Sequence, residues 1–320
     1  MIRKLKLFLI INENYFENVI LMEEVLIKNK KYYFIKAFKD NEFLRKSYNT
    51  LTKKTYGFDF EQWYENGYWG DDYIPYSLID NDNIVANVSI SIINYLVLGQ
   101  HKKYIQIGTV MTDSNYRNKV LARYLLKRVI EEWNNKCDMV YLFANNKVLD
   151  FYPKFGFKAI KEYGYSIEIS NNSNGIAAEK LDMSLDSNRA LVVNSVNNTN
   201  PIAKISMLKN SELIMFYCLS FMSNNVYYLK KQNAIVIAEF KKDTLYIHDI
   251  FSISEVNLDI IIKSITNKEI KTVILGFTPN NIENYNVNLL CDEDTTLFVM
   301  EDKEELFKNN KLMFPVLSHA

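Results

Sequence analysis

The sequence predicts a mixed α/β protein of two domains. With 320 residues the chain is long enough for two domains that each bury a core. Short runs rich in β-branched and aromatic residues alternate with stretches of helical periodicity, and the polar, turn-prone segment 171–175 separates an earlier series from a later one. The order hairpin, strand, helix, strand occurs in both series, which favours a repeated architecture.

The earlier series has a definite order of elements. Asp40 would cap the first helix, because its side-chain oxygen can accept from an amide of the first turn. The polar residues 80–83 predict a turn between two strands. The expected elements are strands at 32–38, 73–79, 84–93, 104–111, 139–144 and 163–169, and helices at 40–54, at 60–64, from about 121, and at 148–155 with a break at Pro153.

One polar corner carries the main functional signal. The strand at 104–111 leads into an amphipathic helix with Leu121, Leu125 and Val129 on one face. At a helix start the first amides lack intrahelical partners and the dipole favours negative charge, so the amides of residues 118–122 can hold a pyrophosphate. Arg117 and Lys119 would add positive charge there. An ordinary strand-to-helix turn is the alternative interpretation.

This corner resembles the acetyl-CoA-binding motif of the GCN5-related N-acetyltransferase (GNAT) superfamily, Arg/Gln-x-x-Gly-x-Gly/Ala, with Arg117, Val120 and Ala122 at its three specified positions. The resemblance covers about residues 31–170 and implies the acyl-CoA N-acyltransferase fold, a central, mostly antiparallel, twisted sheet flanked by helices. It implies acetyl-CoA as cosubstrate. The residues implied to bind it are Val110, Met111, Thr112, Arg117, Asn118, Lys119, Val120, Leu121, Ala122 and Asn145.

The sequence departs from the motif at two positions. Relatives usually place glycines where this chain has Asn118 and Val120, because a missing side chain lets phosphate approach the backbone. A valine still offers its amide if its φ is negative, so we expect weaker or altered cofactor binding.

A second stretch supports the resemblance. Asn145 ends the strand at 139–144, and Tyr152 follows seven residues later in Phe-Tyr-x-x-x-Gly-Phe. In the superfamily an Asn at this strand end contacts the pantetheine arm and a Tyr at this spacing stands beside the thioester sulfur. A phenol can protonate the leaving thiolate, so the resemblance implies that Tyr152 is the catalytic acid. A half-buried aromatic without a chemical role is the alternative.

The acceptor side is less defined. The segment 56–69 is dense in aromatic and acidic residues, and in relatives this region forms the acceptor wall, where such residues suit a cationic amine. The alternative is that Phe58, Phe60, Trp63 and Trp69 form a helix–sheet core. The candidate acceptor-binding residues are Glu61, Trp63, Trp69, Asp71 and Asp72, and the candidate bases are Glu61, Asp71, Asp72 and His101, since Val140 stands where some relatives carry a glutamate base.

The later series predicts a degenerate copy of the same fold. Its loop at 253–257 has no Arg and no Gly, and residues 276–279 replace the expected Asn and Tyr. An unrelated α+β domain is the alternative. The expected elements are strands at 189–193 (joining the domains), 227–230, 234–240, 244–251 and 272–277, and a helix at 258–265. The expected domains are an N-terminal extension at 1–30, forming a helix or a loose arm, a GNAT domain at 31–170, a linker at 171–200 and a second domain at 201–320.

The chain end is unusually apolar, which predicts that it docks on the protein. By analogy with some multidomain relatives, the carboxylate of Ala320, or His319, would act as a base. The alternative is a strand that completes the second sheet.

Composition excludes several classes of protein. Lys+Arg and Asp+Glu both number 38, so no net field favours nucleic acid or an anionic membrane. The three cysteines and three histidines are scattered, which argues against a disulfide scaffold and against zinc and fits a reducing cytoplasm. The apolar run at 7–11 is too short for an export signal. We therefore expect a cytoplasmic N-acetyltransferase that transfers acetyl to a primary amine, on a small molecule or a peptide, by direct attack; the alternative is a non-catalytic acyl-CoA-binding or interaction module.

Overall fold

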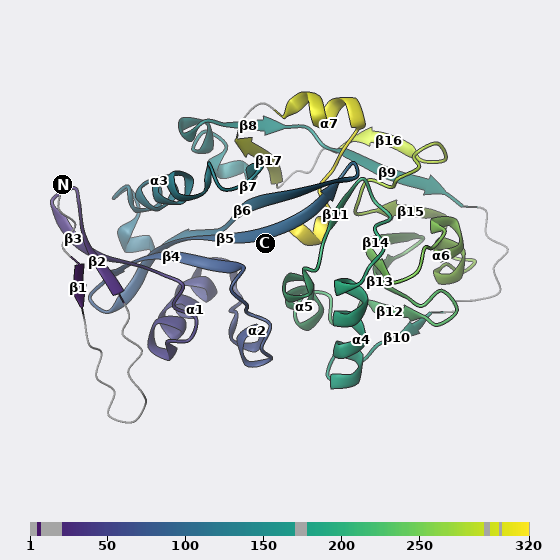
Figure 1. The fold of residues 1–320 in the computed structure, drawn as a ribbon, viewed down its shortest axis with the longest axis horizontal. Coiled ribbons are helices and arrows are strands. Elements are labelled where there is room, and N and C mark those ends of the chain that lie inside the picture. The colour runs from purple at the N-terminus through teal and green to yellow at the C-terminus, as the bar shows by residue number, and fades with distance from the viewer. Residues whose placement is uncertain (1–4, 8–20, 170–177, 291–294, 301–302, 320) are drawn as a thin grey trace. The chain divides into compact units, whose positions relative to one another are not determined.

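The computed structural model describes residues 5–7, 21–169, 178–290, 295–300 and 303–319. The chain forms two compact units, Met1–Ile92 with Ile105–Val140, and Ile93–Tyr104 with Tyr141–Ala320. Strands of the first unit follow the order β1 (Leu5–Leu7), β2 (Leu21–Ile27), β3 (Lys30–Lys36), β4 (Tyr73–Asp80), β5 (Asn83–Val97) and β6 (Gln100–Thr112), and its helices are α1 (Glu42–Tyr56), α2 (Glu61–Glu65), η1 (Ser114–Tyr116) and α3 (Leu121–Trp133) (Figure 1). The tip of the β5–β6 hairpin belongs to the second unit.

The described residues of the N-terminal extension form strands β1 and β2 and a turn, and not the helix or loose arm that we expected. Strand β2 pairs antiparallel with β3, from Glu23 opposite Phe34 to Ile27 opposite Lys30. Lys28 and Asn29 both have positive φ, as a tight hairpin turn requires. Met22, Val25 and Ile27 are buried, so this segment adds a strand to the edge of the sheet.

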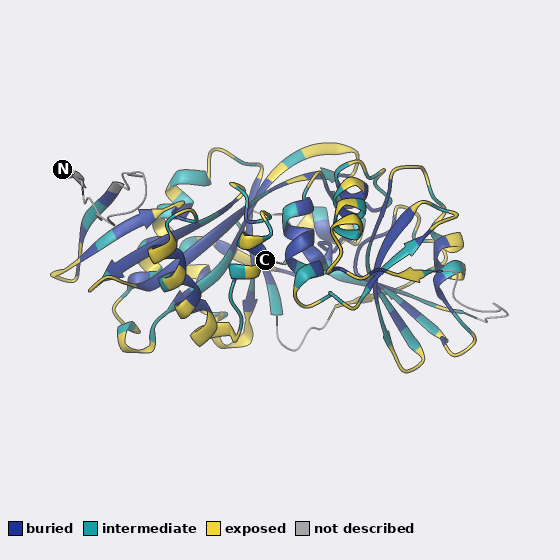
Figure 2. Ribbon diagram, turned by 90° about the horizontal axis from the view of Figure 1, so that it is seen from below, coloured by how far each residue is buried: buried dark blue, intermediate teal, exposed yellow. Residues whose placement is uncertain are grey.

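The remaining elements of the first unit lie close to the ranges expected from the sequence, with one correction. Helix α1 begins one residue later than expected, because Asn41 is its cap and its Oδ1 accepts from the Leu44 amide at 3.0 Å. The turn between β4 and β5 has Asn81 and Asp82 at positive φ. Strands β4 and β5 are buried along most of their length, as the dark blue ribbons in Figure 2 show.

The second unit holds most of the remaining elements. Its helices are α4 (Asp186–Asn197), α5 (Ser211–Leu219), α6 (Leu258–Ile265), α7 (Glu304–Asn310) and the 3₁₀ turns η2 (Asn146–Val148), η3 (Tyr152–Phe155) and η4 (Val316–Ser318). Its strands are β7 (Met139–Asn145), which begins in the first unit, β8 (Phe157–Ile160), β9 (Tyr163–Glu168), β10 (Glu179–Lys180), β11 (Ile205–Met207), β12 (Val226–Leu229), β13 (Ala234–Lys241), β14 (Thr244–Ser252), β15 (Thr272–Leu275), β16 (Asn286–Leu289) and β17 (Thr295–Met300).

Strands β17 and β9 of this unit lie in sheets that their position in the sequence does not predict, and β11 likewise pairs with β5 of the first sheet. Strand β17 pairs antiparallel with β7 on one side and with β8 on the other, although more than 130 residues separate it from both. Strand β9, expected in the first domain, instead lies between β15 and β16 in a second sheet of order β10-β12-β13-β14-β15-β9-β16. The domain ranges 31–170 and 201–320 stay predictions, and neither range contains every strand of its sheet.

The second sheet has the element order that we expected for the degenerate copy. Antiparallel strands β12, β13 and β14 precede α6, and β14 then pairs parallel with β15 from Thr244 opposite Thr272 to Ile247 opposite Leu275. Helix α6 buries Ile261, Ile262 and Ile265 in the core of this sheet.

Two sequence predictions in this unit are wrong. Residues 189–193 form no strand but lie within helix α4, since Val192 and Val196 are buried at helical spacing. Residues 148–155 form a turn and the 3₁₀ turn η3 rather than one helix. The boundary segment 171–175 lies outside the described residues.

The apolar chain end docks, as expected, but it does not add a strand to the second sheet. Leu312, Phe314 and Leu317 are buried, and residues 316–318 form the 3₁₀ turn η4. Phe314 stacks on Tyr141 of β7 with ring centroids 4.2 Å apart. The Val316 amide donates to the Gly276 carbonyl at 2.9 Å, directly after β15 ends. The tail therefore belongs to the core of the second unit.

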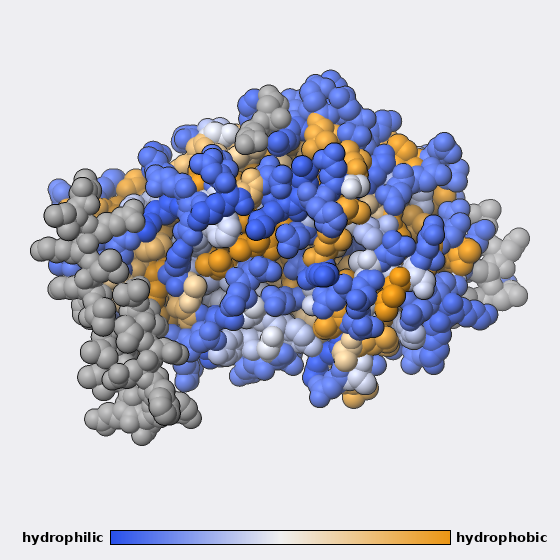
Figure 3. All heavy atoms as spheres, in the orientation of Figure 1, coloured by the Kyte–Doolittle hydropathy of each residue, from blue (hydrophilic) through white to orange (hydrophobic). Residues whose placement is uncertain are grey.

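Among the described residues no helix is both long enough and apolar enough to span a bilayer. Hydrophilic residues cover most of the face in Figure 3, and hydrophobic ones lie in small separate groups.

Gly276→Ala is expected to destabilise the protein. A Cβ at this position would lie 2.6 Å from Val316 Cγ2, 2.8 Å from the His248 carbonyl oxygen and 3.0 Å from His248 Cα. Backbone atoms cannot turn aside as a side chain can, so we expect a loss of about 1–3 kcal/mol in the free energy of unfolding, measured by urea denaturation.

Gly164→Ala is the matched control. The Cβ would there meet Leu290 Cδ2 at 2.7 Å, but the Leu290 side chain is exposed and can rotate away. Its loss should be clearly smaller than that of Gly276→Ala, and equal losses would contradict the close contact between Gly276 and the tail.

Candidate functional site

The polar corner after β6 is built by the backbone. Asp113 caps η1, its side chain accepting from the Asn115 amide at 3.0 Å, and its own amide donates to the Val85 carbonyl at 2.9 Å. Asn118 and Val120 both adopt left-handed conformations, with φ of +62° and +60°. These are the two positions where relatives carry glycine, and left-handed φ is what glycine adopts without strain. The negative φ considered for Val120 is therefore wrong.

Helix α3 begins directly at this corner. Val120 is its N-terminal cap residue but provides no side-chain hydrogen bond to the helix amides. Those amides are left for another acceptor, because the first turn of a helix has no intrahelical partners for them. Arg117, Asn118 and Lys119 are exposed, and Lys119 Nζ lies 4.4 Å from the centre of the Tyr116 ring. Exposed cations beside a bare helix start can bind an anion.

The strand that leads into the corner holds the three predicted pantetheine-pairing residues. Met111 is buried, whereas Val110 and Thr112 are half-buried. The Tyr56 hydroxyl donates to the Val110 carbonyl at 2.9 Å, and Thr52 Oγ1 lies 3.7 Å from Met111 Sδ. Helix α1 thus fixes this end of β6. Leu121 is buried and Ala122 is half-buried, so these two residues offer backbone atoms rather than side chains.

The other two predicted residues lie in the second unit. Asn145 is exposed at the end of β7, opposite Thr295 of β17, and its Oδ1 accepts from the Lys147 amide at 2.9 Å. Tyr152 is 5% exposed and packs against Phe157 and Phe298, the latter from β17. Burial raises the pKa of Tyr152 to about 12. The phenol therefore stays protonated at neutral pH, as a general acid must.

The predicted acceptor residues of the first unit lie mostly in a core. Trp63 and Trp69 are buried and stack at 5.8 Å, as in the alternative interpretation of this segment. Glu61 forms an ion pair with Arg45 at 3.0 Å and accepts from Asn49 Nδ2 at 2.7 Å. Asp71 is exposed and pairs with Lys39 at 3.0 Å; Asp72 is also exposed. The role of these residues in acceptor binding stays a prediction. The Glu61 carboxylate already binds Arg45 and Asn49 within the protein.

The candidate bases are dispersed. His101 is exposed near the start of β6, in the second unit. The ring of His319 stacks on Phe143 of β7 with centroids 3.5 Å apart, and the His319 carbonyl accepts from the Tyr217 hydroxyl. Ala320 lies outside the described residues. Within the described ranges no group of three or more His, Cys, Asp or Glu residues could hold a metal ion.

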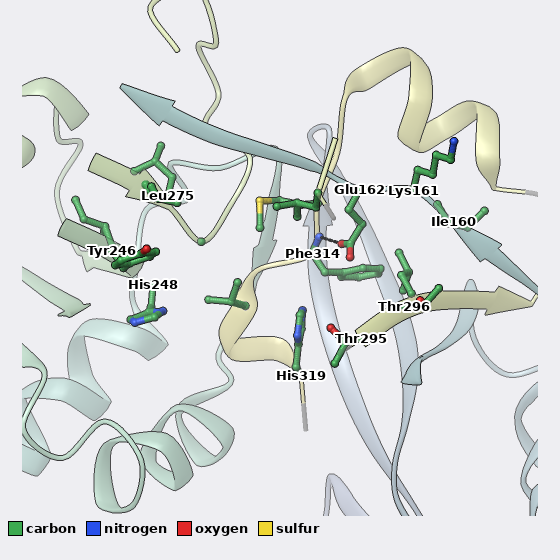
Figure 4. A pocket seen from close by; sticks show the side chains of 17 residues that line it. Ile160, Lys161, Glu162, Tyr246, His248, Leu275, Thr295, Thr296, Phe314 and His319 are labelled. Carbon is green, nitrogen blue, oxygen red and sulfur yellow. Dashed lines mark hydrogen bonds between the residues drawn. The ribbon is translucent and has the colours of Figure 1, made fainter. Parts of the chain in front are cut away.

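A pocket in the second unit was not foreseen from the sequence. It encloses about 360 Å³ and is lined by residues of β14 and β15, by the connection between β8 and β9, by the start of β17 and by the C-terminal tail (Figure 4). Glu162 Oε1 accepts from the Phe314 amide at 2.8 Å at its edge. Its lining residues come from segments that lie far apart in the sequence, so no local sequence pattern could have revealed it.

Comparison with known proteins identifies the domain that contains the corner. Residues 36–160 match the family model described as an acetyltransferase (GNAT) domain, and this part of the chain is therefore a GNAT acetyltransferase domain. The GCN5-related N-acetyltransferase from Kribbella flavida is 13% identical, over 83% of this chain and 71% of that one, with a TM-score of 0.53. A probable N-acyltransferase from Enterococcus faecalis V583 is 11% identical, over 87% and 74%, with a TM-score of 0.55. At these identities the two structures show a shared fold, and no curated protein sequence matches the chain.

Val120→Gly is expected to stabilise the protein. A left-handed conformation costs an ordinary residue about 1–2 kcal/mol, whereas glycine adds about 0.5–1 kcal/mol of lost chain entropy. The net gain should be some tenths of a kcal/mol up to about 1 kcal/mol, measured by urea denaturation.

Lys119→Gly provides the control, because Lys119 is exposed and does not have positive φ. There glycine should only destabilise. If Val120→Gly lowers stability as much as Lys119→Gly does, Val120 is not held in the left-handed conformation in solution.

Proposed function

We propose that the protein is an acetyl-CoA-dependent N-acetyltransferase that acetylates a primary amine by direct attack within a ternary complex. The observation that carries this proposal is the corner at 117–122, where Asn118 and Val120, at positions usually held by glycine in relatives, adopt the backbone conformation that glycine favours, directly at the start of α3. A corner that keeps this backbone keeps the amides pointing outward, whatever its side chains are.

The proposed roles are those that the family resemblance implies for these residues. The amides of residues 118–122 and the charges of Arg117 and Lys119 hold the pyrophosphate. Residues 110–112 and Asn145 bind the pantetheine arm. The buried Tyr152 phenol donates a proton to the departing thiolate, and backbone amides of β6 stabilise the charge on the carbonyl oxygen. The acceptor is a small-molecule or peptide amine.

Acetyl-CoA binding tests the cofactor assignment. Isothermal titration of acetyl-CoA into the wild-type protein should show one site, and the double variant Arg117→Ala, Lys119→Ala should weaken binding about ten- to hundredfold, because each charge-assisted contact contributes about 1.5–3 kcal/mol and exposed contacts contribute less. Lys268→Ala, an exposed lysine of the second unit, is the control and should leave affinity unchanged. The absence of wild-type binding at high micromolar acetyl-CoA would contradict the proposal.

The rival function is a non-catalytic acyl-CoA-binding module, and the strained valine at the corner favours it. Release of free thiol in the presence of a panel of primary amines separates the two functions. Sustained CoA production supports the enzyme, whereas binding without turnover supports the module.

Tyr152→Phe should lower turnover about 10- to 1000-fold while acetyl-CoA affinity stays near that of the wild type, because the change removes a proton donor and keeps the buried ring. Because the pKa of Tyr152 is raised to about 12, the wild-type rate should show no alkaline loss from this group up to about pH 10.

Tyr163→Phe, in the second sheet, is the control and should leave turnover unchanged. Equal turnover of Tyr152→Phe and wild type, where chemistry limits the rate, removes Tyr152 from the mechanism.

A further inference from the structure

A set of buried polar side chains in the first unit converges on Thr109. On the strands, Ser77 Oγ donates to Asn87 Oδ1 at 2.8 Å, and Asn87 Nδ2 donates to Ser89 Oγ at 2.8 Å. Asn87 Nδ2 also donates to the Thr109 carbonyl at 3.0 Å. Asn87 therefore uses its carbonyl oxygen and its amide nitrogen within the protein, and its link to Thr109 joins β5 to β6 by a side chain.

Two tyrosines complete this set. The Tyr48 hydroxyl of α1 lies 3.2 Å from Ser89 Oγ and 2.6 Å from the Tyr73 hydroxyl, which in turn lies 2.7 Å from Thr109 Oγ1. Thr109 is thus held at two points, its carbonyl by Asn87 and its hydroxyl by Tyr73.

Holding Thr109 has a clear physical cost. Its φ is +47°, a conformation that a β-branched residue rarely adopts, and such strain persists only where surrounding contacts enforce it. Removing the polar groups of this network from water also costs free energy. Four of its side chains are completely buried, those of Tyr48, Ser77, Asn87 and Ser89. Apolar residues could fill the same space without this cost of desolvation. Strain combined with a buried polar network is typical of a functional position.

The network fixes the direction of one amide. In a planar trans peptide the C=O and the following N–H point in opposite directions. Because Asn87 holds the Thr109 carbonyl, the Val110 N–H points away from Asn87 and from β5. Val110 is the first of the residues predicted to pair with the pantetheine arm. Of these residues it is the farthest along the chain from the corner at 117–122, so the proposed binding mode brings the thioester to Val110.

Proton transfer along the hydroxyls is a poorer explanation. Burial raises the pKa of Tyr48 well above its usual range and also raises the pKa of Tyr73, so both phenols stay neutral. The hydroxyls connect onward to Ser89 and Asn87, which are completely buried, so a proton received at Thr109 has no base to reach.

We propose that Asn87, assisted by Tyr73, is a positioning residue that holds the Thr109–Val110 peptide so that the Val110 N–H donates to the acyl carbonyl oxygen as charge develops on it. This inference rests on the proposed acetyltransferase function and names the side chain that preorganises its backbone donor. A donor aimed at a developing oxyanion acts mainly on the rate of the chemical step and little on ground-state binding.

Asn87→Leu and Asn87→Asp test the proposal in complementary ways. Leucine has a similar volume and removes the donor at every pH, so kcat should fall about 10²- to 10³-fold while the acetyl-CoA dissociation constant changes less than about threefold. Aspartate can donate to the Thr109 carbonyl only while protonated. Its kcat, expressed relative to wild type at each pH, should therefore rise as the pH is lowered. A purely structural role would not produce this pH dependence.

Thr266→Val is the matched control. Thr266 is completely buried and its hydroxyl donates to the Ile262 carbonyl at 2.8 Å, so the variant loses a buried hydrogen bond at the end of α6, in the second unit, and leaves the network at Thr109 intact. It should lower the melting temperature but not kcat. If kcat falls no further in Asn87→Leu than in Thr266→Val, the positioning role is excluded.

A readout without turnover separates this proposal from the function on which it rests. In protein labelled with ¹⁵N-valine, the Val110 amide resonance should shift between the CoA and acetyl-CoA complexes of wild type, and this difference should vanish in Asn87→Leu. Binding and turnover in wild type without such a shift would overturn the positioning role alone. Absence of wild-type turnover with every amine overturns the enzyme and the positioning role together.

Discussion

Backbone hydrogen bonding of β17 is the constraint on which the second unit depends. This strand comes from near the end of the chain, yet it supplies the ladder partners of both β7 and β8. Without it the inner edges of both strands would present unpaired amides and carbonyls, which proteins avoid. The same strand provides Phe298, against which Tyr152 packs, and Thr295, opposite Asn145. Two predicted site residues are therefore placed by a segment that follows them by more than 140 residues.

In the first unit, conformation matters more than side-chain identity. Asn118 and Val120 occupy positions that favour glycine, yet both keep the left-handed φ that turns the corner into α3. The surrounding contacts, including the Asp113 cap and its link to Val85, hold this path. The amides at a helix start are available because of backbone geometry alone. The replacement of glycine by Asn118 and Val120 therefore adds conformational strain to the corner but leaves its backbone path unchanged.

The second sheet repeats the order of elements without the features of the corner at 117–122. Asn257 caps α6 and its Oδ1 accepts from the amides of Asp259 and Ile260, and Asp259 adds negative charge to the first turn. An anion at this helix start would compete with a side chain and meet a carboxylate. Beyond the parallel pairing of β14 and β15, the Val316 amide binds the Gly276 carbonyl, so the tail occupies the end of these strands. The second unit thus combines a repeated order of elements with a helix start that its own side chain caps.

The sequence by itself determined the elements with strong local patterns and the corner that identifies the GNAT domain. Helix α6 and the strands β4, β7, β12 and β14 were predicted to within a few residues, because alternation and helical spacing are local properties. Only the tertiary structure decided the rest. A six-residue strand such as β17 can pair with any edge, so its sheet depends on contacts across the chain, as does the sheet of β9. Likewise, no sequence pattern marks the side chains that converge on Thr109, which include Tyr73, Ser77 and Asn87. Their convergence depends on strand register and on the packing of α1.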